Sequence, residues 1–395
     1  MNKIYIERHP PKYNRPKVIF NTLEELEELE ESQKIFRNSI GYKIWNADLS
    51  RLDFSSPKGQ ELLQVINEYD DKIIWPEDLK EKYEKRLQDG KYSGLGLSHV
   101  HNNGFTGKGV NIAIIDTPCY LEHPEYQENI KYYKEFGFQE FFQKYGFFPE
   151  NGWSSYHAPA VASLAVGKTC GSAPEANLYF LATQDVGKIQ DGKSILDPSA
   201  RFAAIQHLID LNNTLPESEK IRAVSCSWTI RDTPENYQKS MQLFEELEKT
   251  GCMVIGGSYK WACNTIGGSK IATDSDAYDN LKPIVSNHPW LTLPQNQRTF
   301  ASFCGGYMYT EIGGSSWTMP YLIGIIACGL QANPHYTKQK NWQEKIWQDL
   351  LDTARPIEGS TAKIIQPVAF IQKMLENKQE REMLNQILLK KANGR

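Results

Sequence analysis

The feature that most constrains the fold is a repeated alternation of short apolar runs and longer helical patterns that begins near residue 97. The first run, 110–115, is almost continuously apolar and ends at Asp116. Such runs are typical of parallel strands covered on both faces, so the alternation predicts an α/β fold with a mostly parallel, doubly wound sheet. Functional residues gather at the carboxyl ends of such strands. The expected strands cover 110–115, 176–182, 221–228 and 252–256, and the expected helices cover 97–103, 158–167, 198–212, 235–250 and 321–330.

The beginning of the chain lacks this alternation and reads as helical. Thr22 and Glu25 form a capping box at the start of an acidic helix over 23–32. Further helical patterns cover 60–69 and 77–88, and a glycine-containing loop follows them. We therefore place a domain boundary near residue 95.

Three parts follow from this boundary. We predict an N-terminal helical extension over 1–95, a main domain over 96–375 and a C-terminal amphipathic helix or tail over 376–395. The extension is interpreted as a structural layer that packs on the main domain, and a regulatory or inhibitory segment is the alternative. We expect that it is not removed as a propeptide.

The charge of the chain is nearly balanced, with 44 basic and 48 acidic residues and a formal net charge of −4. Nucleic-acid binding usually needs a strong basic excess, so no nucleic-acid partner is expected. The longest apolar stretch, 319–330, has 12 residues, whereas a membrane-spanning helix needs about 20. We therefore expect no membrane association.

The cysteines and the first residues of the sequence indicate the cellular compartment in which the protein is expected. The seven cysteines are scattered, without a Cys-x-x-Cys pair. This pattern fits reduced thiols better than a disulfide framework. The start of the chain has no apolar region of a secretory signal peptide. A cytoplasmic location is expected, and the sequence leaves the oligomeric state open.

Three reactive side chains stand at the ends of predicted elements. Asp116 ends a strand, His157 directly precedes a helix of small residues, and Ser316 lies before the apolar helix over 321–330. A serine hydroxyl becomes a good nucleophile only when a base removes its proton and a carboxylate holds that base. A serine at a helix N-terminus also lies near backbone N–H groups that stabilise an oxyanion. Each residue alone has an ordinary structural use, but together they indicate nucleophilic catalysis.

The order of these residues resembles that of the subtilisin-like serine peptidases, or subtilases. Asp116, His157 and Ser316 follow one another at separations of 41 and 159 residues, in the chain order of that family. The segments over 107–116 and 171–179 are similar to the family's approach to its aspartate and to the strand after its histidine helix. Further similarity lies at 224–228, Pro320 and 331–334.

The resemblance implies a three-layer subtilisin-like fold for the main domain and serine endopeptidase activity on protein or peptide substrates. In that family's mechanism Asp116 would orient the histidine, His157 would act as general base and acid, and Ser316 would be the nucleophile. No cofactor is required by this chemistry. The resemblance also implies that the substrate would lie extended along the edge of the strand at 224–228.

The chain departs from the family's pattern near the expected oxyanion hole. The resemblance implies that Ser258 stands where the family usually has an asparagine donor. Loss of such a donor costs about 10² to 10³ in turnover, so a slower enzyme is expected. The pairs 158–159, after His157, and 314–315, before Ser316, also differ from the usual Gly-Thr.

Other interpretations compete with the peptidase. The main rival is a weak or inactive subtilase fold that serves as a binding or regulatory scaffold, which Ser258 favours. An α/β-hydrolase would have the serine first in the chain, within G-x-S-x-G, and the segment 167–169 lacks the earlier glycine of a phosphate-binding loop. Asp274, Asp276 and Asp279 are a weak candidate for structural calcium and are interpreted as a solvated acidic loop.

Overall fold

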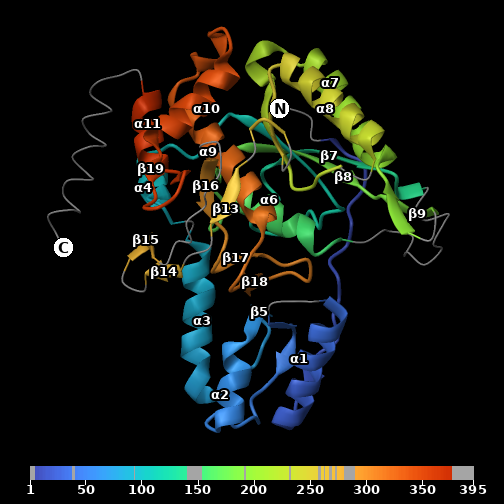
Figure 1. Ribbon diagram of the computed structural model, residues 1–395, viewed down its shortest axis with the longest axis vertical. Helices are drawn as coiled ribbons and strands as arrows, with labels where there is room; N and C mark the ends of the chain where they lie inside the picture. Colours follow the sequence, from blue (N-terminus) through green and yellow to red (C-terminus); the bar gives the residue numbers. More distant parts are fainter. Residues whose placement is uncertain are drawn as a thin grey trace, which may run out of the picture.

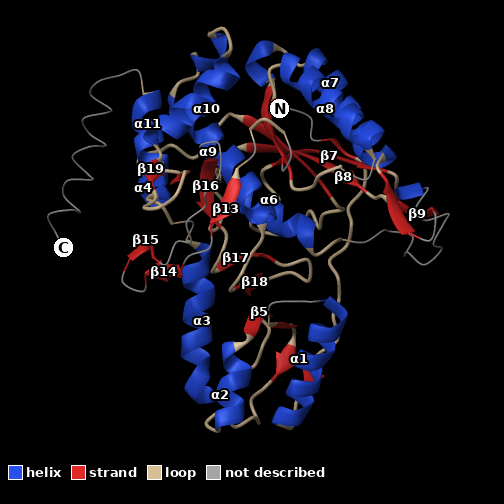
Figure 2. Cartoon of the chain, viewed as in Figure 1, coloured by secondary structure: helices blue, strands red, loops and turns tan. Residues whose placement is uncertain are grey.

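The computed structural model is drawn in Figures 1 and 2, where the helices and strands are identified. Ser258 and the predicted C-terminal tail over 376–395 lie outside the residues that the structure describes. Within the described part, no helix combines the length and the hydrophobicity that a membrane crossing requires. The described residues are 5–37, 41–92, 94–139, 154–190, 193–230, 233–256, 259–261, 263–266, 269–271, 274–279 and 290–375.

A six-stranded sheet forms the centre of the molecule, and every neighbouring pair in it is parallel. The predicted α/β class and parallel sheet are therefore confirmed. Strands β1 and β7, at one side of the sheet, were not expected, because their partly exposed residues lack the continuous apolar pattern of the other strands. The spatial order is β1 (Tyr5–Ile6), β7 (Ile130–Phe136), β8 (Asn177–Thr183), β6 (Asn111–Asp116), β11 (Ile221–Cys226) and β12 (Met253–Gly256).

Two pairs of helices cover this sheet and give it three layers (Figure 1). On one face α6 (His157–Val166) packs against α9 (Thr318–Ala332), and both contact β6. On the other face α7 (Ser199–Thr214) packs against α8 (Pro234–Lys249); α7 contacts β7 and β8, and α8 contacts β12. Helix α9 is buried from Thr318 to Leu330, which accounts for its apolar composition on every side.

Three smaller helices complete the main domain. Helix α4 (Leu97–Asn102) and helix α10 (Trp342–Thr353) both pack against α11 (Pro367–Met374), which in turn packs on α9. Single turns of 3₁₀ helix lie at Glu217–Glu219 (η1), Ser315–Trp317 (η2) and Tyr336–Lys338 (η3).

The chain before residue 93 is not purely helical, which corrects the description of the extension. The helix expected over 60–69 ends at Gln64, and residues 66–70 form a strand instead. The local pattern of this segment is compatible with a helix or a strand, and its pairing with two distant strands makes it a strand. The elements are β2 (Val18–Ile19), α1 (Leu23–Arg37), β3 (Tyr42–Ile44), β4 (Ala47–Asp48), α2 (Pro57–Gln64), β5 (Ile66–Asp70) and α3 (Glu77–Lys91).

We call the described residues between 18 and 92 the N-terminal unit; it extends below the main domain in Figure 1. The unit has its own apolar core, which includes Tyr42, Tyr69 and Tyr83 and also receives Tyr309 from the main domain. A four-stranded sheet joins the two parts, in the order β17 (Arg298–Ala301), β18 (Tyr307–Thr310), β5 and β3. Because β5 and β18 pair antiparallel, the unit is hydrogen-bonded into the main domain.

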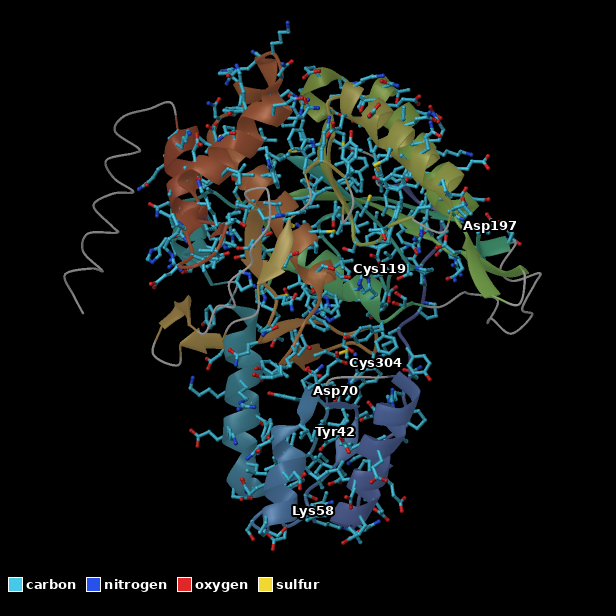
Figure 3. The ribbon with its side chains drawn as sticks, viewed as in Figure 1. Tyr42, Lys58, Asp70, Cys119, Asp197 and Cys304 are labelled. Carbon is cyan, nitrogen blue, oxygen red and sulfur yellow. The ribbon has the colours of Figure 1, made fainter. Side chains whose placement is uncertain are left out.

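Side chains reinforce this junction, where Figure 3 labels Asp70 on the side of the N-terminal unit and Cys304 on the side of the main domain. Lys72 Nζ donates to the Cys304 carbonyl at 2.6 Å, and Thr299 Oγ1 donates to the Leu87 carbonyl at 2.7 Å. Both bonds join a residue of the N-terminal unit to the segment that contains β17 and β18. The division at residue 95 stays a prediction, but the contacts across it are extensive.

Among the described residues, β2 pairs with β4 inside the N-terminal unit, and three further sheets lie outside the two described above. Asp274, Asp276 and Asp279 belong to strand β15 rather than to the loop that the sequence suggested. The sheets are β9 (Val186–Gln190) with β10 (Lys193–Asp197), β14 (Ser269–Ile271) with β15 (Asp274–Asp279), and β13 (Asn264–Ile266), β16 (Trp290–Pro294), β20 (Ala362–Ile364) and β19 (Arg355–Pro356).

Candidate active site

Asp116 ends β6 at the carboxyl edge of the central sheet, and only 3% of its side chain is exposed. Its Oδ1 accepts hydrogen bonds from the Thr117 backbone N–H at 2.8 Å and from the Thr117 hydroxyl at 3.0 Å. A buried carboxylate needs such donors to offset the loss of water. The end of the strand therefore fixes the orientation of the carboxylate.

His157 is the first residue of α6, and its Nδ1 lies 2.8 Å and 3.0 Å from the two Asp116 carboxylate oxygens. With the proton on Nδ1, this atom donates to Asp116 and leaves Nε2 able to accept a proton. Burial lowers the pKa of His157, but the charge of Asp116 and the hydrogen bond to it outweigh burial, so the net pKa is raised. The side chain keeps 30% of its surface exposed, so the base is reachable from outside.

Ser155 ties the loop after β6 to the start of α6. Its backbone N–H donates to the Pro118 carbonyl at 2.8 Å, and its Oγ accepts from the Ala158 N–H at 3.1 Å. A further hydrogen bond joins the hydroxyls of Ser155 and Thr117. Because Thr117 also donates to Asp116, these bonds hold the two segments of the Asp–His pair against each other.

Ser316 lies in η2, directly before α9. Trp317, the next residue, stacks on the imidazole of His157 with ring centroids 5.3 Å apart and 27° between the planes. Ser227 Oγ, just beyond β11, donates to the Ser316 carbonyl at 3.3 Å. Among the described residues no hydrogen bond joins the Ser316 hydroxyl to His157. The structure thus brings Ser316 to the Asp–His pair through its neighbour Trp317.

The end of β11 is also fixed to the strand that carries Asp116. The Trp228 indole N–H donates to the carbonyl of Ile115 at 2.9 Å. The guanidinium of Arg201 lies over the Trp228 ring, 4.8 Å from its centroid, and pairs with Asp185 at 2.5 Å. This segment, expected to pair with an extended substrate, is therefore held by contacts from β6 and α7.

The predicted site residues have different outcomes. Asp116 and His157 are hydrogen-bonded to each other, and Ser316 directly precedes Trp317, which stacks on His157. Ser258 is outside the described residues, so its placement stays a prediction. Sequence reasoning missed Thr117 and Ser155. Thr117 could have been found as a hydroxyl residue directly after the aspartate, and Ser155 as a serine three residues before Ala158, the spacing of a helix cap. The sequence contains no signal for the role of Trp317.

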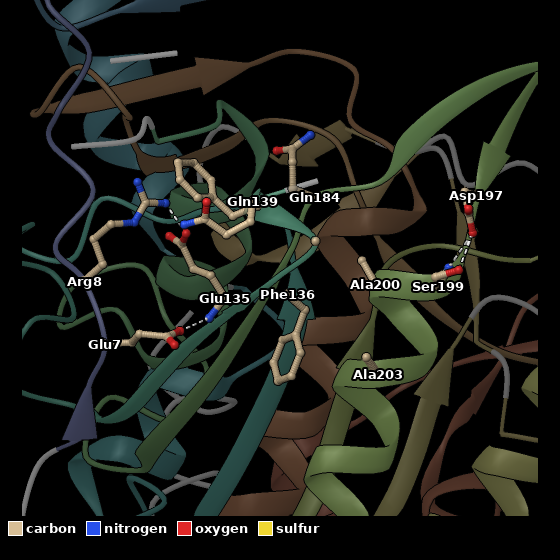
Figure 4. A pocket seen from close by; sticks show the side chains of 12 residues that line it. Glu7, Arg8, Glu135, Phe136, Gln139, Gln184, Asp197, Ser199, Ala200 and Ala203 are labelled. Carbon is tan, nitrogen blue, oxygen red and sulfur yellow. Dashed lines mark hydrogen bonds and ion pairs between the residues drawn. The ribbon is translucent and has the colours of Figure 1, made fainter. Parts of the chain in front are cut away.

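A cavity of about 660 Å³ opens at the carboxyl ends of β7 and β8, near the start of α7 (Figure 4). Its carboxylates already have partners: Glu7 accepts from the Glu135 backbone N–H, Glu135 pairs with Arg8, and Asp197 accepts from Ser199. Its lining includes neither Asp116 nor His157. The cavity is therefore distinct from the Asp–His pair.

The described residues contain no group of three or more His, Cys, Asp and Glu side chains that could hold a metal ion. The calcium candidate on β15 stays a prediction.

The fold and the site define an α/β protein with an Asp–His pair at the carboxyl edge of a parallel sheet and a serine next to the tryptophan that stacks on this histidine. Residues 107–256 match the model described as "Subtilase family", and this segment contains both Asp116 and His157. Over these residues the chain is similar to the subtilase family, as its sequence pattern predicted. Members of this family are generally serine peptidases, which act on proteins or peptides.

Individual relatives are distant. The chain is 23% identical over 292 residues to Furin-1 of Xenopus laevis, in an alignment that covers 66% of this chain and 35% of that protein. The chain therefore spans about a third of the length of this curated relative. The prenylagaramide maturation protease PagA shares 15% identity at a TM-score of 0.49, with 72% of this chain and 99% of that chain covered. A protease from Pseudoalteromonas arctica shares 14% identity at a TM-score of 0.49, with 73% and 98% covered.

Proposed function

We propose that the chain is a serine endopeptidase in which Asp116, His157 and Ser316 form the catalytic triad. The observation that carries this proposal is the hydrogen bond from His157 Nδ1 to the buried Asp116, together with the stacking of Trp317 on the same imidazole. These two contacts fix the His157 imidazole against Trp317. Ser316 is the residue directly before Trp317, so the base and the proposed nucleophile belong to neighbouring segments.

The reaction proceeds in two halves. Ser316 Oγ attacks the carbonyl carbon of the scissile peptide bond while His157 Nε2 takes the hydroxyl proton, and the charge of Asp116 stabilises the imidazolium. The C–N bond then breaks, and His157 passes the proton to the departing amine. Water repeats the same steps on the acyl-enzyme, with His157 again taking and returning a proton, and Ser316 is regenerated.

Two groups are proposed to stabilise the oxyanion of each tetrahedral intermediate. One is the backbone N–H of Ser316, which lies in the turn before α9, and the other is the hydroxyl of Ser258. Donors positioned where charge develops supply a large part of such catalysis. The distance between Ser316 Oγ and His157 shortens when a substrate is bound, as in other enzymes whose catalytic hydrogen bonds tighten on binding.

We propose further that the reaction needs no cofactor and takes place in the cytoplasm, with protein or peptide substrates and no nucleic-acid or membrane partner. All seven cysteines are buried thiols, which suits a reducing compartment. A zinc chelator is therefore expected to leave peptide hydrolysis unchanged.

A fluorophosphonate probe tests the nucleophile directly. The intact chain is incubated with the probe and the labelled residue is mapped by mass spectrometry. We expect labelling at Ser316, loss of labelling and of peptide cleavage in Ser316→Ala, and retention of both in the matched control Ser315→Ala. Loss of a triad nucleophile typically lowers turnover by about 10⁶-fold.

The second candidate function is a non-catalytic binding scaffold of the same fold. Ser258 in the position of the family's asparagine favours it. A folded chain that neither labels at Ser316 nor cleaves any peptide would decide for the scaffold.

A further inference from the structure

Two consecutive residues of β5, Asn67 and Glu68, reach the two segments that carry His157 and Ser316. Both residues belong to the N-terminal unit, which the sequence suggested was only a packed layer or a regulatory segment. The contact of Glu68 ends at the residue before His157, and the contact of Asn67 ends four residues before Ser316.

Glu68 holds the residue that precedes His157. The Tyr156 hydroxyl donates to Glu68 Oε2, and Lys43 Nζ lies 3.1 Å from the same oxygen. Only 1% of the Glu68 side chain is exposed. A hydrogen bond to a buried carboxyl group has a fixed direction, and its loss leaves a buried polar group without its partner. Tyr156 is therefore anchored at its hydroxyl end by the N-terminal unit.

The ring of Tyr156 is anchored as well. Trp45 stacks on it with centroids 5.6 Å apart and 20° between the planes, and Lys43 Nζ lies 4.8 Å from its centroid. Both are residues of the N-terminal unit. Since Tyr156 is followed directly by His157, motion of its ring is transmitted to the start of α6 and to the imidazole.

Asn67 holds the segment that leads to Ser316. The Glu311 N–H donates to the Asn67 carbonyl at 2.7 Å, and the Ile312 N–H donates to Asn67 Oδ1 at 2.9 Å. The Asn67 amide also donates to the Ile312 carbonyl, at 3.5 Å. The side-chain amide thus binds both backbone polar groups of Ile312, four residues before Ser316.

We propose that the N-terminal unit is a working part of the active site, in which Glu68 positions His157 through Tyr156 and Asn67 positions Ser316 through Ile312. This inference rests on the proposed function. Neither residue touches the reacting atoms, so both are positioning residues. A displacement of about 1 Å in a triad costs about 10²-fold in rate, so modest loosening of either contact is measurable.

Tyr156→Phe tests the Glu68 arm, because it removes the hydroxyl and keeps the ring that stacks on Trp45. Tyr69→Phe is the matched control: its hydroxyl donates to the Tyr83 carbonyl at 2.9 Å within the core of the N-terminal unit. Both variants lose one buried hydrogen bond, so both are expected to lose similar thermal stability. Only Tyr156→Phe is expected to lower kcat, by about 10- to 100-fold, with KM within about 2-fold.

Two variants of Glu68 separate hydrogen bonding from bulk. Glu68→Gln keeps an oxygen that accepts the Tyr156 hydroxyl, whereas Glu68→Leu removes it. We expect Glu68→Leu to lower kcat as much as Tyr156→Phe, and Glu68→Gln to retain more of the activity. Combined with Tyr156→Phe, Glu68→Leu should add little further loss, because both changes break the same bond.

Asn67→Ala tests the second arm. We expect slower fluorophosphonate labelling of Ser316 and a lower kcat. The control is Gln60→Ala, which removes a side-chain amide that donates to the Phe54 carbonyl at 2.7 Å, inside the N-terminal unit and away from the active site. Equal labelling rates in Asn67→Ala and the wild type would overturn the role of Asn67.

An NMR titration of His157 in the full chain gives a readout that does not depend on turnover. Weaker coupling to Asp116 lowers the pKa of His157, since burial alone lowers it. The pKa should therefore fall in Tyr156→Phe and stay unchanged in Tyr69→Phe. An unchanged pKa and a kcat within about 2-fold in Tyr156→Phe would overturn the positioning role. If the wild-type chain cleaves no peptide, the proposed function fails, and the titration still decides whether Glu68 positions His157.

Discussion

Trp317 and His157 form a stacked pair, with ring centroids 5.3 Å apart, although they lie on different helical segments that meet at the carboxyl edge of the central sheet. Trp317 also contacts Phe300 of β17, with centroids 4.8 Å apart. The imidazole is thus held on one side by Asp116 and on one face by an indole. Such a ring cannot turn without disturbing the segment that carries Ser316.

The pH dependence of hydrolysis follows from the net rise in the pKa of His157 above its usual value of 6.5. A raised pKa means that the imidazole stays protonated, and unable to accept the serine proton, up to a higher pH than a free histidine. We expect kcat/KM to increase with pH through a midpoint above 6.5. The midpoint is measured from the dependence of kcat/KM on pH with a peptide substrate.

Asp116→Asn is the control for that profile. It removes the charge that raises the pKa and leaves burial, which lowers the pKa, so any residual activity should show its midpoint at lower pH. The same change should reduce kcat by about 10⁴-fold, because the imidazole is then held in the wrong tautomer. If the midpoint of the pH profile is the same in Asp116→Asn and the wild type, the charge of Asp116 is not the cause of the raised pKa of His157.

Ser155→Ala should affect both stability and turnover. The variant loses the hydrogen bond from the Ala158 N–H and the link to Thr117, so the free energy of unfolding should fall by about 1 kcal/mol and kcat should fall with it. Ser56→Ala is the matched control, since Ser56 caps α2 by accepting from the Gly59 N–H at 3.1 Å. Chemical denaturation and peptide kinetics on both variants compare the effects. If Ser155→Ala has the same kcat as the wild type, Ser155 stabilises the start of α6 and has no role in turnover.

Ser258→Ala tests the proposed oxyanion donor. If the hydroxyl acts mainly in the transition state, kcat should fall by up to about 10² to 10³-fold with little change in KM. Ser258→Asn introduces the family's longer donor and is expected to keep or raise the rate. An unchanged kcat in Ser258→Ala, in a chain that Ser316→Ala inactivates, would move the oxyanion donor elsewhere.

Gly324→Ala should destabilise the packing of α9 on α6. A Cβ at Gly324 would lie 1.9 Å from Ser172 Oγ and 3.1 Å from the Ala165 carbonyl oxygen, and Ser172 is fully buried. Overpacking of this kind costs about 1–3 kcal/mol. Gly256→Ala is the control, because its Cβ would meet Cys226 only at an ordinary 3.6 Å. Thermal unfolding of the two variants should therefore separate them; equal losses would show that Ser172 moves aside.

The parts predicted from the sequence are those in which local pattern and tertiary role agree. The apolar run before Asp116 can be buried only as an inner strand, and the all-apolar helix α9 only as a core helix, so both were recognised. Helix α9 begins at Thr318 rather than at Tyr321, because η2 turns directly into it.

The parts that were missed depend on distant partners. Residues 66–70 become a strand through pairing with β3 and β18, and no local pattern shows that Glu68 meets Tyr156, 88 positions away in the chain. The stacking of Trp317 on His157 was equally invisible, because it joins segments whose approach the sheet determines.

The pairing of β5 with β18 also sets the order in which the chain assembles during synthesis. Asn67 and its partner Ile312 are 245 residues apart, which at about 5–20 residues per second is a delay of roughly 10 to 50 s on the ribosome. Throughout that interval one edge of β5 has no neighbour, and an open strand edge invites pairing with other chains. The N-terminal unit therefore emerges before the main domain but is completed only after β18, and nascent chains arrested before β18 should be the forms most dependent on chaperones.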